Sequence, residues 1–178
     1  GQGLYMEPRF ISMKGDTVTQ HGYATDVITD EAIQWLDHRD SNKPFALHIH
    51  HKAPHRYFLA PLKYVKQFQH KIFEEPPTLY ADMAQHGAAW QLQTMSILKD
   101  LKLCSDLKVD PQYLADIPWL KPDAAEVAYY NSIMNRIPEP ERTGLKELFA
   151  ERGKILQAQR PNGNELLKLK FQWYLRDK

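Results

Sequence analysis

One segment, KPFALHIHHKAPHR at residues 43–56, constrains the fold of this chain more than any other. From position 45 to position 50, apolar residues alternate with an alanine and two histidines, which is the pattern of a strand with one packed face. Pro54 has no backbone N–H and disfavours a helical Ala53, so we expect the strand to give way to a loop there. The polar residues of this loop then lie at the carboxyl end of a strand, where open α/β sheets bind their ligands.

Length, charge and cysteine content narrow the class of protein. The chain has 178 residues, which suits one domain or a piece of a larger one. A net charge of +1 gives no electrostatic reason to expect a nucleic-acid or membrane partner. The only cysteine, Cys104, excludes an internal disulfide framework and a multi-cysteine zinc site. The first residues do not resemble a signal peptide and include no initiator methionine, so we expect an excised or internal segment.

The residues before the histidine-rich segment predict a hairpin and a helix. Residues 8–19 combine two strand-like runs with a turn at Gly15-Asp16. Thr29 is a good N-cap, and His38 suits the last turn of the helix that would follow. Residues 1–60 are therefore predicted to form a hairpin, a helix and an active-site strand, in the order typical of α/β proteins. Because three strands cannot complete a doubly wound sheet, we expect partner strands outside this chain.

Residues 61–178 are predicted to be mainly helical. Pro61 precedes a predicted helix over 62–69, and a second helix is predicted over 83–101. Asp110-Pro111 marks the start of a short helix, and Asp123 with Glu126 forms a capping box for the next one. A further helix is predicted from Leu145 to a stop at Gly153, and the last helix is capped by Asn164.

The loop after the predicted strand carries three hydrogen-bond donors. Lys52, His55 and Arg56 lie within five residues, and such a cluster suits phosphate, sulfate or carboxylate. A histidine at this place can also protonate a leaving oxygen near neutral pH. We therefore take His55 as a candidate catalytic residue and all three as candidate substrate contacts.

Other interpretations of these residues stay open. His48 and His50 share one face of the predicted strand, so with His55 they could bind Zn²⁺ in a metal-dependent hydrolase. They could instead be structural and satisfy backbone carbonyls. In a third interpretation the chain is non-catalytic, and its basic loop and tryptophans hold an anionic glycan.

Cys104 and the aspartates of the second half give weaker signals. Cys104 lies in LKLCSDLK, where lysines but no histidine are near, so a buried small residue is favoured over a nucleophile. The spacing of Asp106, Asp110, Asp116 and Asp123 does not match a calcium loop.

Several motifs, taken in order, resemble the formylglycine-dependent (type I) sulfatases. These enzymes share a Gly-Tyr-x-Thr-Asp-x-x-Thr-Asp helix start, a Lys-Pro-Phe strand and a Lys-x-Pro-His loop. The matching positions here are Gly22, Tyr23, Thr25, Asp26, Thr29, Asp30, Lys43, Pro44, Phe45, Lys52, Pro54 and His55. The later PPTLYAD, MSILKDLKLCSDLK and LKLKFQWYLRDK segments are similar to N-acetylglucosamine-6-sulfatases and related bacterial glycosaminoglycan or mucin sulfatases.

The resemblance implies part of an alkaline-phosphatase-like α/β domain that hydrolyses sulfate esters on sugars, in a secreted or periplasmic parent protein. It gives His55 a sulfate contact and a proton-donor role. Lys52 and Arg56 are lesser candidates for sulfate or sugar contact, because they lie beside His55 in the sequence. It also implies calcium and formylglycine in the full-length enzyme.

The chain departs from the family pattern at the nucleophile and the metal. Cys104 precedes Ser-Asp-Leu-Lys and does not fit the Cys-x-Pro/Ser-x-Arg motif of formylglycine formation. The paired aspartates and the Asp-x-Gly…His-Gly segment that bind calcium do not occur in the sequence. We therefore predict no metal ligand in this chain, and we expect the isolated fragment to be inactive and to need the remainder of the sulfatase domain as its partner.

Overall fold

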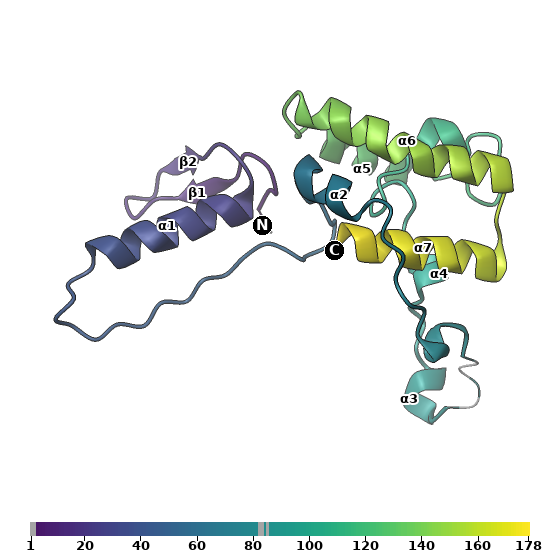
Figure 1. Cartoon of the computed structure of the whole chain (residues 1–178), viewed down its shortest axis with the longest axis horizontal. Helices are drawn as coiled ribbons and strands as arrows, with labels where there is room; N and C mark the ends of the chain where they lie inside the picture. Colours follow the sequence, from purple (N-terminus) through teal and green to yellow (C-terminus); the bar gives the residue numbers. More distant parts are fainter. Residues whose placement is uncertain (1–2, 82–83, 85) are drawn as a thin grey trace.

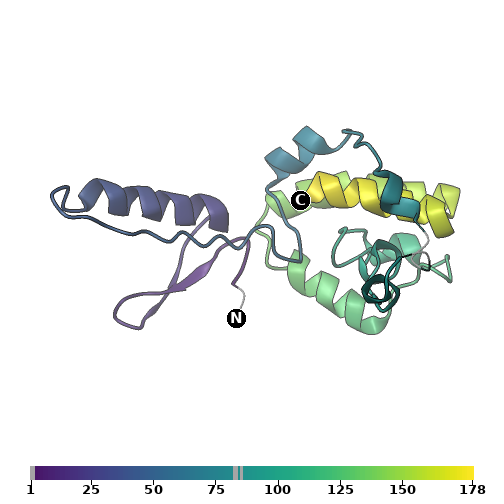
Figure 2. The ribbon, with the colours of Figure 1, turned by 90° about the horizontal axis from the view of Figure 1, so that it is seen from below.

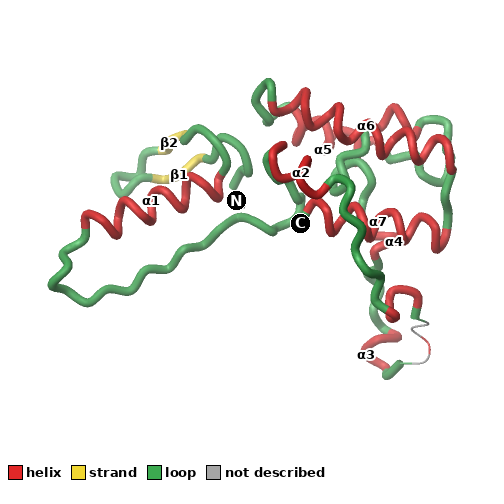
Figure 3. The backbone as a smooth tube through the Cα atoms, viewed as in Figure 1, coloured by secondary structure: helices red, strands yellow, loops and turns green. Residues whose placement is uncertain are grey.

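The computed structural model describes residues 3–81, 84 and 86–178, which form two parts of different character. Figure 1 shows a hairpin with one helix, α1, beside a larger helical part that contains α2 and α4–α7. Figures 1 and 2 both show a long extended segment that returns along α1 and joins the two parts. Figure 3 shows this segment entirely as loop. No helix among the described residues is long and apolar enough to cross a membrane.

The predicted hairpin is present. Strands β1 (Arg9–Ile11) and β2 (Thr17–Thr19) pair antiparallel, with Phe10 opposite Val18. Gly15 lies in the turn with a φ of +89°, a conformation that glycine adopts at little cost.

Helix α1 (Ala24–His38) ends where the sequence predicts but begins five residues before Thr29. The prediction of Thr29 as N-cap is wrong, because its hydroxyl donates to the Thr25 carbonyl (2.8 Å) one turn back inside the helix. The helix begins at the buried Ala24, whose N–H donates to the Tyr5 carbonyl (2.8 Å). A contact with a segment distant in sequence therefore fixes this end of the helix.

Residues 43–50 are extended but have no strand partner among the residues that the structure describes. The strand predicted there is thus not formed in this structure, because a strand exists only where a neighbour completes its hydrogen bonds. The segment instead contacts α1: the Phe45 ring lies edge-on to Trp35 (centroids 5.5 Å apart) and under the Arg39 guanidinium (4.5 Å).

The helical part agrees with the prediction for residues 61–178 in its general character. Its elements are α2 (Leu62–Phe68), η1 (Pro77–Tyr80), α3 (Ala88–Gln91), α4 (Ile97–Asp100), η3 (Pro111–Leu114), α5 (Ala124–Met134), α6 (Glu141–Gln159) and α7 (Gly163–Asp177).

Two predicted N-caps are confirmed. Asp110 accepts a hydrogen bond from the Gln112 N–H (3.0 Å) at the start of η3, and Asp123 accepts one from the Glu126 N–H (2.7 Å) in α5. The second half of the predicted capping box is missing, since the Glu126 carboxylate accepts from the Cys104 N–H (2.9 Å). Glu126 therefore joins α5 to the segment before η3.

Three other helix predictions are wrong. The long helix over 83–101 is replaced by α3 and α4, the latter capped by the Ser96 hydroxyl (3.1 Å to the Lys99 N–H); its predicted start, Met83, lies outside the described residues. Gly153 does not stop α6, which ends instead before Arg160 with a φ of 43°. Helix α7 begins at Gly163, before the predicted cap Asn164.

The core lies between α6, α7 and the segment that leads to η3. Leu107, Leu145 and Leu156 are fully buried, and Trp173 is almost so. Cys104 is also fully buried, and burial raises the pKa of its thiol, as expected of a structural cysteine.

Buried charges cross this core. Arg152 of α6 donates to both carboxylate oxygens of Asp177 in α7 (2.7 and 2.5 Å) and to the Leu107 carbonyl (2.8 Å). The Lys108 ammonium donates to the Ser105 and Asp106 carbonyls (2.6 and 3.0 Å). The Arg152 bonds fasten both long helices to the 105–108 segment, and the Lys108 bonds close that segment on itself.

We expect Gly153→Ala to destabilise the chain although alanine is the better helix former. A Cβ at this position would lie 2.3 Å from the Tyr113 ring of η3. Overpacking costs about 1–3 kcal/mol, and an overlap this severe should cost an amount near the upper end of that range. This cost outweighs the gain of about 1 kcal/mol from the higher helix propensity of alanine. Urea unfolding measures the difference. Lys154→Ala, on the exposed face of the same helix, is the control and should change stability by less than about 0.5 kcal/mol. Equal stabilities for the two variants would contradict the close packing of η3 on α6.

We also expect stability to rise with pH in the alkaline range. Burial lowers the pKa of Lys108 from 10.5 to about 8. Below about pH 8 both states hold the proton and the folded state bears the full cost; above it, the unfolded chain binds more protons and stability increases. The contribution of Lys108 to the free energy of unfolding should therefore rise from about pH 8 and level off near the ordinary lysine pKa of 10.5.

Lys108→Met should flatten this rise, and Lys154→Met, which removes an exposed lysine of α6, should leave it unchanged. Some slope should persist in Lys108→Met, because burial also lowers the pKa of Lys170 to about 8. The same slope in wild type and Lys108→Met would show that Lys108 is not the titrating group.

Candidate functional site

The loop that carries the three predicted site residues is a tight turn. The His55 N–H donates to the Lys52 carbonyl (2.9 Å), and the Ala53–Pro54 peptide bond inside the turn is cis. The Tyr5 hydroxyl donates to the His55 carbonyl and ties the turn to the N-terminal segment. His55 is thus held through its main chain from two directions.

The imidazole of His55 is exposed, yet one of its nitrogens has a fixed partner. Its Nδ1 forms a hydrogen bond with the Arg56 carbonyl. Because a carbonyl only accepts, Nδ1 must carry the hydrogen, and Nε2 is left as the nitrogen that gains or loses a proton. This arrangement suits a general acid or base that acts through Nε2.

The Arg56 guanidinium is bound inside the chain. Its Nε and one terminal nitrogen donate to the two oxygens of Asp106 (2.7 and 2.6 Å), and the same terminal nitrogen donates to the Asp100 carbonyl (2.6 Å). Asp106 is completely buried and also accepts from the Lys102 N–H (2.7 Å). The hydrogen bond to Asp106 holds the pKa of Arg56 above its ordinary value. Arg56 therefore anchors the loop, whereas its predicted contact with substrate stays a prediction.

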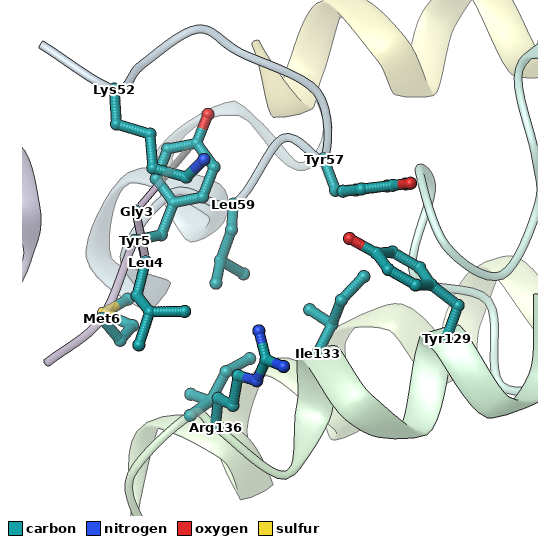
Figure 4. Close-up of a pocket in the computed structure, with 11 residues that line it drawn as sticks. Gly3, Leu4, Tyr5, Met6, Lys52, Tyr57, Leu59, Tyr129, Ile133 and Arg136 are labelled. Carbon is teal, nitrogen blue, oxygen red and sulfur yellow. The ribbon is translucent and has the colours of Figure 1, made fainter. Parts of the chain in front are cut away.

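Lys52 lies on a different side of the loop from Arg56. Its ammonium is 4.7 Å from the centroid of the Tyr5 ring, and burial lowers its pKa. It lines a pocket that also contains Leu59 and Tyr129 (Figure 4), whereas Arg56 lines another with Asp100. The structure thus brings Lys52, His55 and Arg56 into one turn but does not gather them around one anion.

Asp106 is the residue of this site that sequence reasoning did not single out. Its only sequence signal is an acidic residue among apolar positions of the segment LCSDLKV, where an unpaired carboxylate would be costly if the segment were buried. A partner was therefore required, but nothing in the sequence identifies it as Arg56, fifty positions earlier.

His48 and His50 are exposed, so the structural interpretation, in which they satisfy buried carbonyls, finds no support here. Their rings stack with centroids 6.2 Å apart. Across the described ranges no three histidine, cysteine, aspartate or glutamate side chains come together as a metal site would need. The described residues thus offer no site for the zinc of the hydrolase alternative, and the calcium that the resemblance implies stays a prediction for the full-length enzyme.

The tryptophans of the glycan-binding alternative are dispersed. Trp173 is buried, while Trp90 on α3 and Trp119 are about half exposed (53% and 54%). Figure 1 shows α3 protruding from the helical part. The Trp119 indole N–H donates to the Pro161 carbonyl (3.1 Å) and so serves packing.

Comparison with known proteins places this site in context. No family model matches the chain. An N-acetylglucosamine-6-O-sulfatase of Bacteroides thetaiotaomicron is 36% identical over 176 residues, covering 99% of this chain and 30% of that protein. The structure of BT4656 in complex with its substrate D-glucosamine-2-N,6-O-disulfate matches with a TM-score of 0.82 and 34% identity, covering 99% of this chain and 34% of that one.

The chain thus spans about a third of the length of the relatives that it matches. Over that third, the resemblance to sulfatases predicted from the motifs is confirmed in sequence, and the α/β fold expected from the resemblance is confirmed in structure.

We expect Asp106→Asn to destabilise the turn that carries His55. The amide presents N–H groups where Asp106 now accepts only, so a donor of Arg56 or of Lys102 loses its partner. We expect the free energy of unfolding to fall by roughly 2–3 kcal/mol. Breaking a fully buried pair costs roughly 3–5 kcal/mol, and the cost is smaller here because the Arg56 side chain is 42% exposed. Urea unfolding and hydrogen exchange of the His55 amide measure the effect.

Asp40→Asn is the matched control, because the Asp40–Lys43 pair (3.1 Å) is exposed on both sides. Its effect should stay within about 0.5 kcal/mol. Unchanged exchange of the His55 amide in Asp106→Asn would show that the turn does not depend on the buried pair.

Proposed function

We propose that this chain is a segment of a sulfatase that hydrolyses sulfate esters on sugars, and that the turn at residues 52–56 supplies its sulfate-contacting histidine. The observation that carries the proposal is the match to an N-acetylglucosamine-6-O-sulfatase over 99% of the chain. The position of His55, exposed on a turn that two hydrogen bonds of the main chain hold, supports this assignment.

The role that we assign to His55 is that of general acid. When the ester S–O bond breaks, its electron pair goes to the sugar oxygen, which needs a proton to leave as an alcohol. An imidazolium whose Nδ1–H is bound to the Arg56 carbonyl can donate only from Nε2. The fixed Nδ1 bond thus selects the nitrogen that faces substrate, and Lys52 would add a positive charge beside the sulfate.

The substrate class follows from the relatives. One is an N-acetylglucosamine-6-O-sulfatase and the other binds D-glucosamine-2-N,6-O-disulfate as its substrate. We propose a 6-O-sulfated glucosamine, of the kind found in glycosaminoglycans, as the substrate of the protein to which this chain belongs.

The nucleophile and the metal belong, in this proposal, to the rest of that protein. Formylglycine would supply the nucleophile and calcium would neutralise the sulfate charge, both held by residues outside this chain. The isolated chain should consequently turn over no substrate. A secreted or periplasmic location completes the proposal, since sulfated glycans are extracellular polymers.

We expect His55→Ala, in the sulfatase that contains this chain, to lower turnover of 6-O-sulfated glucosamine by roughly 10²–10⁴-fold. An aryl sulfate with an acidic phenol as leaving group needs little protonation, so its turnover should fall far less. Steady-state kinetics on both substrates separate proton donation from sulfate binding, which would affect the two equally.

His48→Ala serves as the control, because His48 is an exposed histidine of the same segment. Its rate should stay within about threefold of wild type, well below the effect of losing a general acid. A loss below tenfold in His55→Ala on the sugar sulfate would exclude His55 as the general acid.

A further inference from the structure

Among the residues that the structure describes, two carboxylates are buried, and one of them is bound to the turn that carries His55. Asp177 pairs with Arg152 inside the helical core. Asp106 accepts hydrogen bonds from the guanidinium of Arg56, the residue that follows His55 (2.7 and 2.6 Å). Because Asp106 is completely buried, it cannot touch a substrate. Any role that it has in the reaction must therefore act through Arg56.

The guanidinium of Arg56 is held at more than one point. Besides its two bonds to Asp106, it donates to the Asp100 carbonyl (2.6 Å). The carboxylate of Asp106 is itself fixed, because it also accepts from the Lys102 N–H (2.7 Å). If the arginine turned away, a buried carboxylate would be left short of donors, which is a costly state. The position of the Arg56 main chain is consequently coupled to that of Asp106.

The main chain of Arg56 in turn acts on the imidazole of His55. Its carbonyl accepts the Nδ1–H hydrogen bond, and the bond that one ring nitrogen makes decides which nitrogen holds the hydrogen in the neutral ring. In the proposed step, the proton passes from Nε2 to the sugar oxygen as the S–O bond breaks and sulfur passes to the nucleophile. The imidazole that remains has its hydrogen on Nδ1. An acceptor fixed at Nδ1 therefore favours the product of this proton transfer.

We propose that Asp106 is a positioning residue for proton donation by His55. Through Arg56, it keeps in place the carbonyl that orients the imidazole and selects its tautomer. The inference rests on the proposed function and adds to it the buried group that controls the chemical step. Asp106 affects the departure of the sugar, whereas binding of the sulfate belongs to the groups that touch it.

Asp106→Asn in the full sulfatase tests the inference. We expect kcat for 6-O-sulfated glucosamine to fall by about 10- to 100-fold, as for a misplaced catalytic group, with KM changed by less than about threefold. For an aryl sulfate with an acidic phenol, which needs little protonation, kcat should fall by less than about threefold.

Gly153→Ala is the matched control. It should cost a similar amount of stability, but it acts on the contact between α6 and Tyr113 of η3. Its kcat should stay within about threefold of wild type on both sulfates. A loss on the sugar sulfate as large as that of Asp106→Asn would show an effect of destabilisation alone and would overturn the inference.

A double-mutant cycle shows whether Asp106 acts through His55. In the His55→Ala background the acid is already lost, so Asp106→Asn should lower kcat on the sugar sulfate by less than about a further twofold. Equal losses in the two backgrounds, or equal losses on the sugar and aryl sulfates, would contradict the positioning role.

The tautomer of His55 gives a readout that destabilisation alone does not change. Nitrogen NMR of the histidine-labelled enzyme at alkaline pH reports which ring nitrogen holds the hydrogen, and His55→Ala identifies the signal. We expect the Nδ1–H form in wild type and a mixture of the two tautomers in Asp106→Asn. The same tautomer in both proteins would also overturn the inference.

A second variant covers the case in which Asp106→Asn does not fold. Arg56→Lys leaves Asp106 a charged partner but cannot form the planar bidentate pair. Its kcat should fall on the sugar sulfate and much less on the aryl sulfate. A raised KM for both sulfates with kcat unchanged would instead make Arg56 a sulfate contact and would overturn its positioning role.

The outcomes separate this inference from the proposed function. A wild-type enzyme that hydrolyses no sugar sulfate would overturn the proposed function, and the tautomer measurement would then decide whether Asp106 orients His55. A wild-type enzyme that hydrolyses the sugar sulfate, with an Asp106→Asn variant that behaves like Gly153→Ala, would overturn only the role of Asp106.

Discussion

The bidentate pair between Arg56 and Asp106 is the interaction on which the arrangement of the site depends. It joins the turn at residues 52–56, in which the extended segment after α1 ends, to the Asp106 segment of the helical part. A buried carboxylate is costly unless its oxygens are satisfied, and here the guanidinium and the Lys102 N–H together do so. The cost of burying Asp106 unpaired is therefore what keeps Arg56, and with it the Arg56 carbonyl, in place.

Buried charges are satisfied by hydrogen bonds in the core as well. Arg152 and Asp177 satisfy each other across α6 and α7, and the Lys170 ammonium donates to the Leu98 and Leu101 carbonyls (2.8 and 2.7 Å). These bonds, with those of Lys108, satisfy carbonyls in α4 and in the irregular segment that follows it up to residue 108. The long helices thus supply charged donors to a loop, and that loop supplies Asp106 to the site. Packing alone would leave the loop carbonyls unpaired, which explains why charged residues occupy core positions.

How far the sequence predicts this molecule depends on the range of the interaction involved. The hairpin at Gly15 and the caps at Asp110 and Asp123 were predicted correctly, because each depends on residues that are close in the sequence, ten positions apart at most. The start of α1 and the continuation of α6 through Gly153 were not, since Tyr5 and Tyr113 decide them from elsewhere. The strand at residues 43–50 is the extreme case: its alternation is real, but no described neighbour completes its hydrogen bonds.

The site shows how an exposed histidine can still be oriented. Burial is one way to fix a side chain, but the His55 imidazole is exposed. Here orientation comes from the main chain: the Arg56 carbonyl receives Nδ1, and the Tyr5 hydroxyl and Lys52 carbonyl hold the His55 peptide. Because Arg56 is fixed by its own side chain, the residue that follows His55 acts as a rigid support. A turn of five residues can thus present one accessible ring nitrogen, Nε2, in a fixed orientation. Proton transfer to a defined oxygen requires such an orientation.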